Sequence, residues 1–152
     1  MDSHPNLALL APVPFVFLPE GEELCRRKGK VAFGSRAWEL FRELDNLRDG
    51  LPVEVFIYAS QTDDPSLVVS WHGYYIGSVE SDNGAHPEGR KYRPAYTTKD
   101  GEDRAGYWGV FWEVADLKPT PPIPIGKLRG HGAKKAYGTP FVPEGPIIID
   151  RP

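Results

Sequence analysis

The chain has little of what metal and disulfide sites require. Its 152 residues include one cysteine, Cys25, and four histidines. One cysteine excludes an internal disulfide framework and most structural zinc sites, and no histidine has a partner at metal-ligand spacing. The sequence therefore predicts no metal and no cofactor. The cysteine usage fits a reducing, cytoplasmic environment.

An excess of charge is also lacking. The chain has 18 lysines and arginines against 21 aspartates and glutamates, for a formal net charge of −3. A protein that coats nucleic acid through its phosphates is normally basic, so this balance argues against nonspecific duplex coating. It is compatible with a module that reads a single base in a pocket.

Long hydrophobic runs are missing as well. The most apolar stretch, Leu7–Leu18, is interrupted by Pro12 and Pro14, and no basic segment precedes it. This pattern predicts an extended strand, at a sheet edge or on irregular extended backbone, with no signal peptide and no membrane span. Residues 81–106 have almost no aliphatic side chain, which predicts a long surface loop.

The residues that are present predict one small α+β domain. Apolar residues make up 40% of the chain, enough for one core over 1–152, and 16 Gly and 16 Pro favour short strands and loops. We expect one main helix over Ser35–Arg48, with Ser35 as its N-cap and Leu40, Leu44 and Leu47 on its buried face.

Around this helix the pattern predicts a small, curved mixed or antiparallel sheet or barrel. The expected strands, in addition to Leu7–Leu18, are Val53–Ser60, Leu67–Glu80 with bends at Gly73 and Gly77, Tyr107–Val114, and a terminal strand at Ile147–Ile149. Glu20–Lys30 reads as a polar segment and Asp116–Pro124 as a proline-rich bend.

Aromatic side chains are the main candidates for a binding site. Because residues alternate between the two faces of a strand, these rings cannot all lie in one core, so at least one of them should lie near the surface or a pocket, where it can stack on a ligand. The set is Trp38, Trp71, Tyr74, Tyr75, Trp108, Phe111 and Trp112. The loop Phe33-Gly34-Ser35-Arg36 is either a plain helix cap or a contact for a base or phosphate.

Two further motifs give weaker signals. The sequence holds no G-x-S-x-G nucleophile motif, and we assign no catalytic residue, although the composition alone leaves a Ser/His/Asp triad open. The strip containing Lys127, Arg129, Lys134 and Lys135 lacks the spacing of a phosphate-binding loop. It is interpreted as a mobile basic strip that contacts a nucleic-acid backbone.

The order of these segments resembles the EVE domain family of the PUA-like superfamily, which also includes YTH domains. The similarity lies in Phe33-Gly34-Ser35-Arg36 before the helix, then Val55–Ser60, then Tyr75-Ile76-Gly77-Ser78-Val79-Glu80. It extends to Trp112-Glu113-Val114 and the segment Pro122–Leu128. The G-x-K-x-x-E-x-R motif of the related ASCH domains is absent, which argues against a nuclease.

The resemblance implies a PUA-like fold whose pocket accepts a modified base flipped out of DNA or RNA. The pocket walls would be Phe33, Gly34, Ser35, Arg36, Ser60, Gln61, Trp71 and His72. Expected partners are a nucleic acid with a modified base, in defence against modified foreign DNA, and an effector nuclease or other protein. The alternatives are a small RNA- or nucleotide-processing enzyme on the same fold and a protein-interaction module.

Overall fold

The computed structural model describes residues 2–95, 103 and 107–152. The elements within them follow in chain order: β1 (Leu7–Pro14), α1 (Phe17–Lys28), β2 (Val31–Ser35), α2 (Trp38–Leu47), β3 (Val53–Ser60), β4 (Val68–Glu80), β5 (Val110–Pro124), the short 3-10 helix η1 (Ile125–Lys127) and β6 (Ile147–Asp150). Together they form an α+β fold, as predicted.

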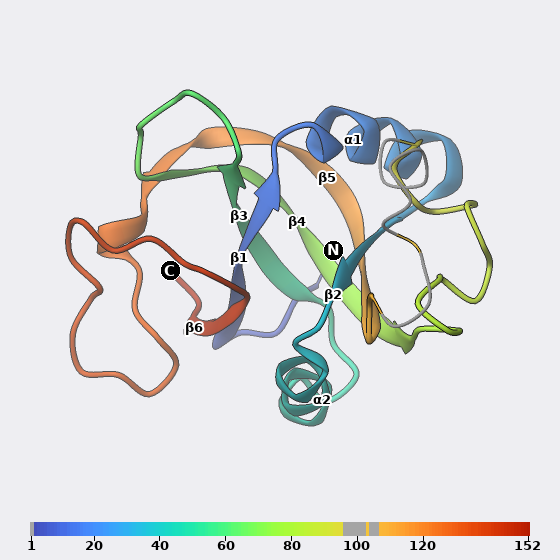
Figure 1. The fold of residues 1–152 in the computed structure, drawn as a ribbon. Helices are drawn as coiled ribbons and strands as arrows, with labels where there is room; N and C mark the ends of the chain where they lie inside the picture. The colour runs from blue at the N-terminus through green and yellow to red at the C-terminus, as the bar shows by residue number, and fades with distance from the viewer. Residues whose placement is uncertain (1, 96–102, 104–106) are drawn as a thin grey trace.

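The six strands form one mixed sheet in the order β2-β5-β4-β3-β1-β6. Only β1 and β3 run parallel, and the other neighbours are antiparallel. The sheet is strongly curved, and the two helices lie at opposite ends of it (Figure 1). Of the two predicted forms, a curved sheet or a barrel, the structure shows the open sheet, because β2 and β6 form the two outer strands and do not pair with each other within the described residues.

Helix α1 was not predicted from the sequence. It buries a narrow stripe of Phe17, Leu18, Gly21 and Leu24 and ends at Gly29, whose left-handed backbone donates to the carbonyl of Cys25. Gly21 is needed for close packing, because a Cβ there would lie 2.8 Å from Leu117 Cδ2. Polar residues and a glycine therefore concealed a helix that packs tightly on β5.

Helix α2 begins three residues later than predicted. Ser35 is not its N-cap but the last residue of β2, although its hydroxyl accepts a hydrogen bond from Ala37 N at 3.0 Å. Phe41 and Leu44 form the buried face. Leu47, expected on that face, is 40% exposed.

Strand β5 is longer than predicted, and the expected proline-rich bend at Asp116–Pro124 is part of it. The prolines fit because β2 pairs only with Val110–Val114 of β5. Beyond Val114 one edge of β5 has no neighbouring strand, and on the other edge the pairing with β4 is interrupted between Pro119 and Ile123. Pro121 and Pro122 lie in this interruption, so they remove no sheet hydrogen bond. The bends expected at Gly73 and Gly77 are confirmed by shifts in the β4–β5 register next to both residues.

Two hydrophobic clusters cover the two faces of the sheet. The larger one fills the concave face and is closed by α1 and α2. It includes Leu18, Phe41, Trp71, Tyr75 and Trp112. The smaller one lies on the outer face beneath η1 and the segment that leads to β6, and it includes Leu10, Phe56, Ile125, Leu128 and Ile149.

Trp71, which we expected in a binding pocket, is a core residue. Its side chain belongs to the larger cluster and is 7% exposed. We expect Trp71→Ala to lower the free energy of unfolding by about 3–5 kcal/mol, because it removes a large buried ring and leaves a cavity. Urea denaturation measures this change.

The matched control is Trp38→Ala, since Trp38 is 49% exposed on α2. Its effect should stay within about 1 kcal/mol. Equal stability of the Trp71→Ala variant and the unmodified protein would show that the ring does not belong to the core.

Candidate functional site

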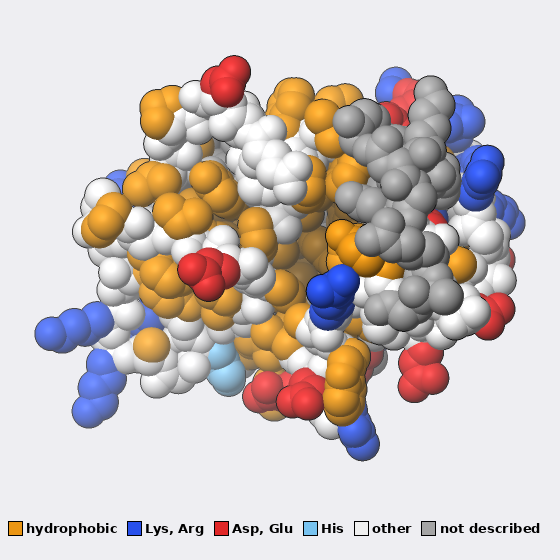
Figure 2. Space-filling view, in the orientation of Figure 1, with side chains coloured by type: hydrophobic (Ala, Val, Ile, Leu, Met, Phe, Trp, Pro, Cys, Tyr) orange, Lys and Arg blue, Asp and Glu red, His pale blue; other side chains and the backbone are white. Residues whose placement is uncertain are grey.

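A hollow opens between β1 and β2, in the middle of the face shown in Figure 2, and hydrophobic side chains line it. Its volume is about 480 Å³. This lies within the range of pockets that hold small organic ligands. We call it the β1–β2 pocket.

The pocket exists because β6 covers only half of β1. The two strands pair from Leu7 to Leu10, and Leu10 is opposite Ile147, the first residue of β6. Arg151 N donates to Asn6 O at 3.0 Å, so the even-numbered residues of β1 face β6. Pro12 and Pro14 continue this series past the end of β6. Because proline has no N–H, the uncovered edge of β1 presents carbonyl acceptors without unpaired donors.

The facing edge of β2 is also partly covered. Ala32 N donates to Tyr92 O at 2.8 Å, and Ala32 O accepts from Arg93 Nη1 at 2.8 Å. Gly34, two residues further along, has its N–H and C=O on the same side of the strand. Gly34 lines the pocket. The wall therefore has a backbone donor and a backbone acceptor side by side.

The floor of the pocket is apolar and partly aromatic. Phe17 comes from α1, Phe33 from β2 and Trp112 from β5, with Ala11 and Val13 of β1 opposite them. The rings of Phe33 and Trp112 are 5.0 Å apart between centroids. These residues also belong to the larger core cluster. The floor is thus held by the core of the fold.

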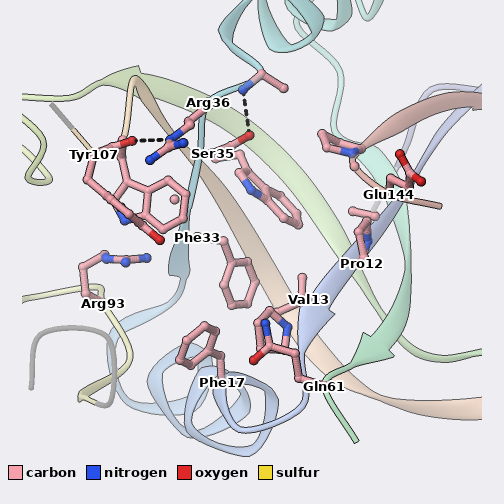
Figure 3. A pocket seen from close by; sticks show the side chains of 18 residues that line it. Pro12, Val13, Phe17, Phe33, Ser35, Arg36, Gln61, Arg93, Tyr107 and Glu144 are labelled. Carbon is pink, nitrogen blue, oxygen red and sulfur yellow. Dashed lines mark hydrogen bonds between the residues drawn. The ribbon is translucent and has the colours of Figure 1, made fainter. Parts of the chain in front are cut away.

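Polar side chains stand around the rim. Arg36 Nε donates to Tyr107 O at 2.9 Å, and its guanidinium lies 4.7 Å from the centroid of the Tyr107 ring. Glu144 lies on the other side of the pocket, and Gln61 stands beside Val13 (Figure 3). Arg36 and Glu144 place opposite charges on opposite sides of the pocket, and the other charged residue of the described lining, Arg93, is paired with Asp103. This balance suits a ligand that is polar but carries little net charge.

Trp108 forms an aromatic wall of the pocket and rests directly on Gly34. A Cβ at Gly34 would lie 2.5 Å from Trp108 Cε2 and 2.7 Å from its Nε1. The ring can occupy this place only because residue 34 has no side chain. The indole N–H is buried and has no hydrogen-bond partner among the described residues. A buried donor without an acceptor costs about 1–3 kcal/mol, so this arrangement calls for a functional explanation.

A buried ionic cluster fixes the segment that follows β4. Glu113 on β5 accepts from Lys30 Nζ at 3.1 Å and contacts His86 Nε2 at 3.0 Å. His86 Nδ1 accepts from Glu88 N at 3.0 Å, so the proton of the neutral ring is on Nε2, which donates to Glu113. Burial raises the pKa of Glu113, but the hydrogen bonds from His86 and Lys30 outweigh it, and the net shift is downward.

The same segment is held by Arg93, which is only 3% exposed. Arg93 Nη2 lies 2.7 Å from Asp103 Oδ1, in addition to its contact with Ala32 O. The described part of the predicted surface loop is therefore packed on β2 and β5, and Arg93 itself lines the pocket. Residues 96–102 and 104–106 of that loop lie outside the described residues.

Five of the eight predicted pocket residues line the β1–β2 pocket, namely Phe33, Gly34, Ser35, Arg36 and Gln61. Three do not. Ser60 accepts a backbone hydrogen bond from Phe15 N at 2.9 Å, and Trp71 is in the core. His72 points to the other face of β4, where its Nε2 lies 3.0 Å from Glu54 Oε1.

Sequence reasoning missed several residues that line the pocket. Tyr107 is not among the predicted site residues, and Trp108 and Trp112 belong to the predicted aromatic set but not to the eight predicted pocket residues. Their alternation along the chain was the signal that could have selected them. The contribution of β1 to the pocket could not be predicted from local sequence patterns, because it depends on how much of β1 is paired with β6.

The basic strip is better ordered than predicted. Arg129 O accepts from Asp150 N at 2.9 Å, and His131 N donates to Ile148 O at 3.0 Å, so the strip is attached to the edge of β6. Lys127, Arg129 and Lys134 line a second hollow, and Lys135 does not. None of these residues lines the β1–β2 pocket.

Within the part of the chain that the structure describes, no group of three His, Cys, Asp or Glu side chains is arranged to hold a metal ion. No helix in the same residues is long and apolar enough to cross a membrane. Compared with protein-family models, with curated proteins and with solved structures, the chain gives no significant match.

The contact between Gly34 and Trp108 gives a direct test of the pocket wall. We expect Gly34→Ala to lower the free energy of unfolding by about 1–3 kcal/mol, because the added methyl group overlaps the indole ring. The displaced indole should also change the near-ultraviolet circular dichroism. Gly145→Ala is the matched control, since Gly145 also lines the pocket and a Cβ there meets no atom within 4 Å. Equal stability of the two variants would contradict this account of the wall.

The Glu113 cluster predicts how stability depends on pH. Since the pKa of Glu113 is lowered on folding from about 4.5, its contribution is complete above that value and is lost as pH falls through the folded-state pKa. Glu113→Gln should therefore be less stable at neutral pH, by about 1–3 kcal/mol, and lose less stability on acidification. Thermal unfolding from pH 7 to pH 3 measures both effects, with exposed Glu39→Gln as the control. Parallel pH curves for Glu113→Gln and the unmodified protein would disprove the role of Glu113.

Proposed function

We propose that the protein is a nucleic-acid-binding module that holds a modified base, flipped out of its strand, in the β1–β2 pocket. In this proposal the domain is PUA-like and related to EVE domains. The strongly curved sheet with helices at its ends is consistent with that relationship. The modification is the feature recognised, as in defence against modified foreign DNA, and an effector protein supplies any subsequent chemistry.

The observation that carries this proposal is the position of Trp108 on Gly34. Glycine is unfavourable inside a strand, and one in this position marks a close approach by another group. Here the approaching group is an indole that forms a flat wall of a pocket. Flat aromatic walls bind nucleobases by stacking, at about 1–3 kcal/mol per base. This gain can offset the few kcal/mol that base flipping costs.

The polar groups of the pocket support the same ligand class. A nucleobase presents hydrogen-bond donors and acceptors along its edge, and the wall offers the N–H and C=O of Gly34 with the hydroxyl of Ser35 nearby. Arg36 on the rim can contact the adjoining phosphate. The enzyme alternative would use tyrosine, His72 and lysine or arginine side chains. Of these, His72 lies outside this pocket and is paired with Glu54.

The proposal predicts that Trp108→Ala weakens binding of an oligonucleotide with a modified base by about 1–3 kcal/mol, the contribution of one stacked base. Fluorescence anisotropy with strands that carry methylated or hydroxymethylated bases, beside unmodified strands of the same sequence, measures this loss. Trp38→Ala is the control, because Trp38 is an exposed tryptophan that does not line the pocket. If Trp38→Ala weakens binding as much as Trp108→Ala, or no modified strand is preferred, the proposal is wrong.

A further inference from the structure

A second hollow, separate from the β1–β2 pocket, gathers positive charge at the C-terminal side of the sheet. It has a volume of about 290 Å³ and is lined by four cationic side chains, Lys127, Arg129, Lys134 and Arg151. We call it the basic hollow. Asp150 is its only acidic lining residue in the described part of the chain. This surplus of positive charge stands out in a chain with a formal net charge of −3.

The backbone around the basic hollow is fixed by hydrogen bonds. Arg129 O and His131 N bond to β6, as described above, and Tyr137 N donates to Leu128 O at 2.9 Å. Leu128 itself is 2% exposed in the outer cluster. The lysines and arginines therefore project from an ordered frame.

The two guanidinium groups are also oriented. Arg129 Nε lies 2.9 Å and its Nη2 2.8 Å from Asp150 Oδ2, which leaves Nη1 for another acceptor. Arg151 binds Glu54 Oε2 through Nε at 2.5 Å, and both of its terminal nitrogens remain available. Lys127 and Lys134 have no ion-pair partner among the described residues. Guanidinium and ammonium groups arranged in this way are the groups that proteins use to bind phosphate.

β6 connects the basic hollow to the β1–β2 pocket. Pro146, just before β6, lines the pocket, and Asp150, at its end, lines the hollow. Four strand residues span about 13 Å, which is comparable with the axial rise of about four stacked nucleotides at 3.4 Å each. Figure 2 shows Lys and Arg side chains at the lower left of the face that contains the pocket, over the C-terminal segments.

We propose that the basic hollow binds phosphate groups of the same strand that delivers its base to the β1–β2 pocket, a few nucleotides away from that base. This inference rests on the proposed function. Base identity is then read in the pocket, while the hollow contributes affinity without sequence information. Phosphate contacts give a salt-dependent affinity, with a slope of about −0.7 in log affinity against log salt for each contact to a single strand.

The test compares two double variants with the same change in net charge. Lys127→Glu/Lys134→Glu reverses two cations of the hollow, and Lys91→Glu/Lys118→Glu reverses two exposed lysines outside both hollows. Affinity is measured for single strands of two to twelve nucleotides, with and without a modified base, over a salt series. For the longer strands we expect the hollow variant to reduce the salt slope by about 1.4, from two lost contacts. The control variant should keep the slope.

The hollow variant should keep the preference for the modified base, and on the shortest strands it should bind like the control. Equal losses in both double variants, or none in either, would overturn the inference. If the hollow variant loses binding of inorganic phosphate but binds every strand like the control variant, the hollow is a site for free phosphate and the inference is also overturned. If the hollow variant alone weakens binding but modified and unmodified strands bind equally, the proposed base pocket fails and the phosphate site stands.

Discussion

The hydrogen bonds that β1 and β2 do not make are the constraint on which the site depends. A curved sheet of six strands can close into a barrel when its edges pair. Here β6 begins at Ile147, opposite Leu10, so the second half of β1 does not pair with it on that side. Pro12 and Pro14 lower the free-energy cost of this uncovered edge, since proline has no backbone N–H that would otherwise lie there without an acceptor. The gap remains open and becomes the β1–β2 pocket.

An open gap beside the core requires that the surrounding elements be fixed by other means. Asp45 holds α2 to β4 by accepting from Tyr75 Oη at 2.8 Å, Ser78 Oγ at 3.0 Å and Arg48 Nε at 2.8 Å. Burial, with a smaller contribution from Asp45, raises the pKa of Tyr75, so this hydroxyl remains a donor. Glu113 fixes the segment after β4 on the other side. The pocket therefore lies between two elements that hydrogen-bonded carboxylates hold in place.

Local sequence patterns predicted most strands and the helix after Ser35. Segments rich in β-branched and aromatic residues indicate strands, and leucines at helical spacing indicate a helix. They missed α1, where Gly21 is explained by contact with Leu117 on a distant strand. They also ended β5 too early, since its prolines are permitted only where β2 has already stopped. Both errors involve residues whose role depends on a neighbour far away in the sequence.

The candidate site shows the same contrast between residues that a local pattern predicts and residues whose role depends on distant parts of the chain. The residues from Phe33 to Arg36 form a local sequence motif and could be predicted as part of the site. Trp71 and Trp108 are both tryptophans in aromatic segments, and only their packing in the folded chain shows which one lies in the core and which one lines the pocket. Trp71 pairs opposite Ile57 in the middle of the sheet, and Trp108 precedes β5 and rests on Gly34. The contribution of Pro12 follows from the length of β6, which no local pattern encodes.

The central claim is that a base occupies the β1–β2 pocket against Trp108. Photo-crosslinking from a strand that carries a halogenated pyrimidine at the modified position, followed by mass spectrometry of the peptides, tests it most directly. The account predicts adducts on the aromatic lining of the pocket, at Trp108, Tyr107 or Phe33. Adducts confined to Trp38 or to residues of the basic hollow, with none in the pocket, would contradict it.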